Sequence, residues 1–156
     1  MRRGIIYGLF IGLALIVYFL AMKLLGLEHN FYLRIFNFVI LIGGVYLLLR
    51  REFFQTDKSI SYFEGLGLGL RATITAVLVF LVFLAIYVKV FDPGFIEVLE
   101  ESQIWGTNIT LNQAAIGIFI EGMASAIAIS FAWMQYFKKY TSSPTRLKSK
   151  ESLGKR

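Results

Sequence analysis

Cysteine is absent from the 156-residue chain, and histidine occurs once, at His29. The absence of cysteine excludes disulfides, thiolate catalysis and cysteine-ligated metals, and one histidine makes neither a catalytic triad nor a metal site. The sequence also contains no P-loop, no G-x-S-x-G motif and no H-E-x-x-H motif. Each of these motifs would aim specific groups at a phosphate, an acyl carbon or a zinc ion. We therefore predict a protein that is not an enzyme, with no catalytic residue, no metal and no cofactor.

Charged residues are also scarce. They make up 17% of the chain, against 57% hydrophobic residues, and the mean hydropathy is +0.67. A soluble domain of this size would have too little polar surface at that composition. The apolar residues are gathered in four runs, at 4–25, 31–49, 72–88 and 111–137. Each run is close to the ~20 residues that a helix needs to cross a bilayer.

The lysines and arginines lie mainly on one side of these runs. With the N-terminus inside the cell, 13 of the 16 are cytoplasmic, and only Lys23, Arg34 and Lys89 lie on the other side. An excess of Lys and Arg in cytoplasmic segments sets the orientation of membrane helices. The asymmetry therefore predicts four spans with both termini in the cytoplasm.

The four spans and their short loops account for residues 1–139, which we predict to be one transmembrane domain. Residues 140–156 are rich in Lys, Arg, Ser and Thr, and we predict a basic, disordered cytoplasmic tail. The net charge of +6 lies mostly in this tail. It favours anionic lipids at the cytoplasmic face of the lipid bilayer as partners, and it does not indicate nucleic acid.

Polar signals mark where several helices begin and end. Ser61 with Glu64, and Thr110 with Gln113, have the spacing of a capping box, which predicts a helix start at each. Asp92-Pro93-Gly94 ends the third run, and residues 95–101 then mix apolar and acidic side chains as an amphipathic surface helix does. The predicted fold is all-α: an integral membrane four-helix bundle with a short amphipathic surface helix between helices 3 and 4.

Small residues recur every four positions in three segments. In lipid, such stripes let helix backbones approach closely, and packing rather than hydrophobicity then drives association. We expect them to pack inside one bundle, with a homodimer interface as the alternative. The predicted packing residues are Gly4, Gly8 and Gly12 in the first run, Gly65 and Gly69 before the third, and Gly122 and Ala126 in the fourth.

Glu121 is the one acidic residue inside a run. Placing a carboxylate there costs at least ~2.5 kcal/mol, so such a residue is by default a candidate functional site. One hypothesis is a structural polar cluster in which Glu121 pairs with Arg34, with Asn37 one turn further along and Lys23 as the substitute partner. The alternative is coupling to a proton or a cation.

Several features together resemble one family. They are Gly43-Gly44 in the second run, the loop ending Ile60-Ser61-Tyr62-Phe63-Glu64-Gly65, the Asp92-Pro93 stop with its acidic continuation, and a last run rich in small residues. Over most of residues 4–139 the chain is similar to the small bacterial membrane proteins of domain-of-unknown-function family 4199, frequent in Bacteroidota. The resemblance implies a four-span protein of the bacterial inner membrane. It implies no activity and no catalytic residue.

Two functional hypotheses from different classes follow. The first is a non-enzymatic scaffold or accessory subunit for another membrane component, with a second copy or another membrane protein as partner. The second is a small carrier or ion-coupled transporter that uses Glu121. A polar cavity reaching Glu121 would favour the carrier, whereas a dry core with an exposed groove of small residues would favour the scaffold.

Overall fold

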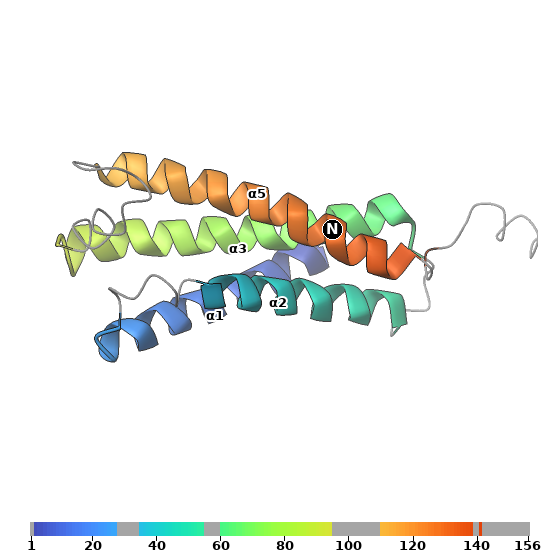
Figure 1. The fold of residues 1–156 in the computed structure, drawn as a ribbon, viewed down its shortest axis with the longest axis horizontal. Coiled ribbons are helices and arrows are strands. Elements are labelled where there is room, and N and C mark those ends of the chain that lie inside the picture. Colours follow the sequence, from blue (N-terminus) through green and yellow to red (C-terminus); the bar gives the residue numbers. More distant parts are fainter. Residues whose placement is uncertain (1, 28–34, 55–59, 95–109, 139–140, 142–156) are drawn as a thin grey trace, which may run out of the picture.

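The computed structural model describes residues 2–27, 35–54, 60–94, 110–138 and 141, and within these ranges it contains four α-helices and no strand. The helices are α1 (Arg2–Leu24), α2 (Ile35–Phe54), α3 (Tyr62–Val90) and α5 (Leu111–Phe137). Figure 1 shows them side by side along the long axis, with α1 running obliquely behind α2 and α3. The predicted all-α four-helix bundle is confirmed.

Three of the described helices are long and apolar enough to cross a membrane: α1, α3 and residues 112–137 of α5. Their outward faces carry large apolar side chains such as Phe10, Val82 and Ile120, which are 68%, 61% and 61% exposed. Water-soluble monomers rarely expose apolar surface on this scale. The helix α2 carries Arg50, Arg51 and Glu52 just before its end at Phe54, and the predicted second span, residues 31–49, begins outside the described residues.

The two ends of the bundle differ in charge. At one end, which we call the basic end, α1 and α3 begin and α2 and α5 finish. This end carries Arg2, Arg3, Arg50, Arg51 and Lys138 against Glu52 and Glu64. Among the described residues, the opposite end carries Lys23, Lys89 and Asp92.

The helix α3 is central, because both α1 and α5 pack on it through small residues. A Cβ atom at Gly8 of α1 would lie 2.5 Å from the carbonyl oxygen of Ala72, and one at Gly122 of α5 would lie 2.6 Å from Val77. The other predicted glycines lie in the same two interfaces: Gly4 and Gly12 against Leu68 and Val79, and Gly65 and Gly69 against Met134 and Ser130. Ala126 of α5 is fully buried. At Gly8 a side chain would collide with the backbone of α3, whereas at Gly65 the closest atoms belong to the flexible Met134 side chain.

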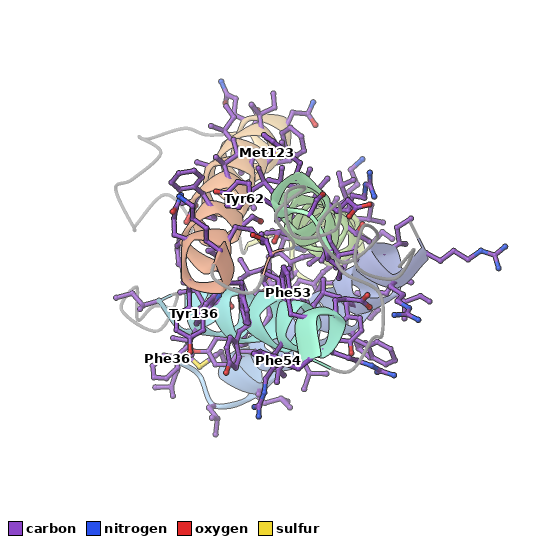
Figure 2. The ribbon with its side chains drawn as sticks, turned by 90° about the vertical axis from the view of Figure 1, so that its right-hand side faces the viewer. Phe36, Phe53, Phe54, Tyr62, Met123 and Tyr136 are labelled. Atoms are coloured by element: carbon purple, nitrogen blue, oxygen red, sulfur yellow. The ribbon has the colours of Figure 1, made fainter. Side chains whose placement is uncertain are left out.

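Aromatic rings join α2 to α5 near the basic end. Phe53 stacks on Phe137 with ring centroids 5.2 Å apart, and Tyr46 lies 4.7 Å from Trp133. The Trp133 indole Nε1 also donates a 3.0 Å hydrogen bond to the carbonyl oxygen of Ile42. In the end view of Figure 2, Phe53 points from α2 toward the middle of the bundle, whereas Phe54 points away from it. These contacts fix the rotation of α2 about its own axis.

Local hydrogen bonds define several helix ends. Both predicted capping boxes are confirmed, at Ser61 with Glu64 and at Thr110 with Gln113. The helix α1 ends at Leu24, and Gly26 follows it with a φ of 66°, which suits glycine because a Cβ would be strained there. The segment predicted to form a surface helix, residues 95–101, lies outside the described residues.

Candidate functional site

A groove of about 600 Å³ runs between α1 and α2. From α1 it is lined by Ile6, Tyr7, Phe10, Ile11 and Ala14. From α2 it is lined by Val39, Ile40, Gly43, Gly44, Leu47 and Arg51. Apart from Tyr7 and Arg51, every lining residue is apolar or glycine.

Small residues on α2 create the groove. The glycine face of α1 is covered by α3, so α1 presents a different face, with Ile11 on it, to α2. Ile11 packs directly on Gly44, where a Cβ would lie 2.5 Å from its Cγ1 atom. At the neighbouring Gly43, a Cβ would face open space, with no heavy atom of another described element within 4 Å. The two helices therefore touch at Gly44 and leave a trough beside it at Gly43.

The polar groups of the groove lie at the basic end. Arg51 Nη1 donates a 3.0 Å hydrogen bond to the Tyr7 hydroxyl, and this bond raises the pKa of the Arg51 guanidinium, which stays charged. The exposed Arg51 forms no ion pair with a described carboxylate. Most of its N–H donors are therefore available to an anion.

A second arginine beside the groove is already neutralised. Arg3 Nη1 donates to both carboxylate oxygens of Glu52, at 2.9 and 3.1 Å. The Glu52 side chain is only 9% exposed, so this ion pair ties the start of α1 to the end of α2. The cation that faces an incoming ligand is consequently Arg51 rather than Arg3.

The predicted polar cluster is described only in part. Glu121 lies half-buried on α5, and its backbone carbonyl accepts a 2.7 Å hydrogen bond from Ser125. Asn37 lies near the start of α2, with its Oδ1 atom buried and without a hydrogen bond from a described residue. Arg34 lies outside the described residues, so its pairing with Glu121 stays a prediction. Within the described ranges no three His, Asp or Glu side chains gather as metal ligands.

Lys23 has a partner at the end opposite to the basic end. Its ammonium group donates a hydrogen bond to the Asp92 carboxylate, and the two side chains are 27% and 25% exposed. Glu121 precedes Gly122, which packs on Val77, and more than three helical turns of α3 separate Val77 from Asp92. The ion pair with Asp92 therefore holds Lys23 several helical turns away from the level of Glu121. The sequence indicates Asp92 only as part of a helix stop.

No motif in the sequence marks Tyr7 or Arg51 as functional. A signal for them exists, because Arg51 follows Gly43 and Leu47 at four-residue spacing, which marks one face of a helix. The same spacing separates Tyr7 from Ile11 on the other helix. The pattern identifies two faces, and only the structure shows that these faces meet.

Apolar helices of spanning length, packed as a bundle with an apolar outer surface, define an integral membrane protein. The family described as Protein of unknown function (DUF4199) matches residues 6–147. The chain belongs to this family, as the resemblance in its sequence predicts. No curated protein and no solved structure matches the chain.

Proposed function

We propose that this protein is a non-enzymatic scaffold or accessory subunit that binds another membrane component in the α1–α2 groove. The observation that carries the proposal is the open space at Gly43, where a glycine in mid-helix leaves a trough that no described side chain fills. A glycine inside a helix lowers its stability relative to alanine, so an open one suits a site where something approaches the backbone closely.

The packing of the remaining helices supports binding rather than transport. The interfaces of α3 with α1 and α5 are closed by direct contact between small residues and the opposite helix. The groove is lined by neither Glu121 nor Asn37, so it offers a carrier no path to the intramembrane carboxylate. These two observations favour the scaffold over the carrier that uses Glu121.

The proposal includes a location. The basic residues at one end of the bundle favour the cytoplasmic face of the bacterial inner membrane, with both termini in the cytoplasm. Phosphatase and fluorescent reporters fused at Lys155 and near Ser102 test this topology in cells. We expect fluorescence at Lys155 and phosphatase activity near Ser102, and phosphatase activity at Lys155 would contradict the four-span arrangement.

A blocking substitution tests the binding role itself. Gly43→Phe places a ring in the trough, where the structure leaves room for it, and we expect the variant to fold. The full-length protein is extracted in mild detergent, and native mass spectrometry measures its mass together with any component that remains bound. We expect a bound component on the unsubstituted protein and at least a tenfold lower occupancy on Gly43→Phe.

Gly67→Phe is the matched control. Gly67 is also a helical glycine whose Cβ would meet no heavy atom within 4 Å, but it lies on α3 and does not line the groove. We expect Gly67→Phe to keep the bound component. Equal occupancy on the two variants, or none on the unsubstituted protein, would overturn the proposed function.

A further inference from the structure

We infer that the component bound in the α1–α2 groove is an anionic glycerophospholipid, with one acyl chain lying along the trough and its phosphate on Arg51. This inference rests on the proposed function and names the ligand of the same groove. It follows from the length of the groove, from the position of its charge and from the way its two arginines are engaged.

The length of the groove matches one leaflet of a bilayer. Val39 and Arg51 mark its extent along α2, and 12 residues of helix at 1.5 Å each span about 18 Å. Half of a ~30 Å hydrocarbon core is ~15 Å. A transmembrane helix of a partner protein would need a surface about twice as long. An acyl chain needs one leaflet, so the dimensions favour a lipid.

The charge of the groove lies where a lipid headgroup would be. Its lining is apolar from Val39 to Leu47, and the first charged group is Arg51, at the basic end of α2. The groove is thus apolar along its length and cationic at one end. This pattern complements a lipid, which is apolar along its acyl chain and anionic at its headgroup. A zwitterionic headgroup would gain less, because its own ammonium competes with the guanidinium for the phosphate.

The hydrogen bonds at the mouth leave one arginine free to bind. Glu52 holds Arg3, whereas the Tyr7 hydroxyl orients Arg51 without cancelling its charge. A guanidinium whose donors are arranged as a planar fork suits the oxygens of a phosphate. Tyr7 and Arg51 also come from the two helices that form the trough, so a phosphate there would contact both walls.

The experiment measures lipid binding by native mass spectrometry. The full-length protein, stripped of lipid in detergent, is titrated with phosphatidylglycerol, phosphatidylethanolamine or phosphatidylcholine of the same acyl composition. We expect phosphatidylglycerol to bind at least fivefold more tightly than phosphatidylcholine. Arg51→Gln should weaken phosphatidylglycerol binding roughly fivefold and abolish most of the preference, because a cation near an anionic surface contributes about that factor.

Arg50→Gln is the matched control for charge. It removes the same unit of charge from the adjacent position of α2, but Arg50 does not line the groove. We expect it to change phosphatidylglycerol binding less than twofold. Gly43→Phe should weaken binding of all three lipids, since it blocks the chain rather than the headgroup.

The outcomes separate the inference from the proposed function. If Gly43→Phe releases a bound protein while lipid binding is unchanged, the lipid is wrong and the scaffold role stands. If Arg50→Gln and Arg51→Gln act equally, the preference reflects net charge and the phosphate site on Arg51 is refuted. If neither Gly43→Phe nor Arg51→Gln changes the amount of any bound component, both the proposed function and the lipid inference are refuted.

Discussion

Arg3 of α1 and Glu52 of α2 form an ion pair in which one guanidinium nitrogen reaches both carboxylate oxygens, at 2.9 and 3.1 Å. The Arg3 side chain is 58% exposed and the Glu52 side chain only 9%, so the two partners are not equivalent. Losing Arg3 would leave a nearly buried carboxylate without its cation, whereas losing the charge of Glu52 would leave an arginine that water can solvate.

The asymmetry predicts the order of two variants. Arg3→Gln should lower the free energy of unfolding by about 1–2 kcal/mol, and Glu52→Gln by less, because glutamine still accepts a hydrogen bond from Arg3. Thermal melting in detergent measures both, with Arg2→Gln as the control for charge at an exposed position. A loss for Arg3→Gln no larger than for Arg2→Gln would show that the pair does not stabilise the α1–α2 contact.

The glycine face of α1 predicts a second pair of variants. Gly8→Leu should destabilise the protein by about 1–3 kcal/mol or more, because its side chain would collide with the backbone at Ala72. Gly67→Leu, at an open position of α3, should change the melting temperature little. A melting temperature that Gly8→Leu leaves unchanged would mean that α1 does not pack on α3 through this face.

Lys23 and Asp92 predict an energetic coupling between α1 and the end of α3. Both side chains are about three-quarters buried, so their interaction is less screened than that of a surface pair. A double-mutant cycle with Lys23→Met and Asp92→Asn should give a coupling of about 1 kcal/mol in the free energy of unfolding. Strictly additive effects would indicate that the pair contributes nothing to stability.

The Glu121 hypothesis predicts a difference between two substitutions. Arg34→Leu should destabilise the protein by about 3 kcal/mol, since it would leave an intramembrane carboxylate without a cation. Glu121→Gln should cost less, because glutamine keeps a hydrogen-bonding group at the same position. Chemical unfolding in mixed micelles ranks the two variants, and a larger loss for Glu121→Gln would contradict the predicted pairing of Glu121 with Arg34.

Helix positions followed closely from the sequence, because their signals are local. The helix α5 spans Leu111–Phe137, as its apolar run and its capping box at Thr110 predict. The helix α3 starts at Tyr62, directly after its predicted cap at Ser61 and well before the apolar run that begins at Ala72. Capping depends on residues three apart in the chain, so a single sequence carries this information.

The groove and the Lys23–Asp92 pair depend on distant residues and could not be predicted in the same way. The groove forms because α1 packs its glycine face on α3 and a second face on α2. A stripe of glycines in the sequence does not indicate which helix will pack on it. Lys23 meets Asp92 only because α1 and α3 run parallel and end at the same level. Both features follow from the relative rotation and register of helices, which the local pattern leaves open.

The contact of α1 with α3 has a consequence for biosynthesis. The glycine face of α1 is covered by a helix that the ribosome makes only after α2 has been completed. Before α3 is synthesised and inserted, the first two helices lie in the membrane with Gly4, Gly8 and Gly12 exposed to lipid or to a neighbouring nascent chain. A chain that stops after α2 would keep this face uncovered, and its best available cover would be the same face of another truncated copy. The third helix therefore both completes the fold and removes a site of premature association between newly made chains.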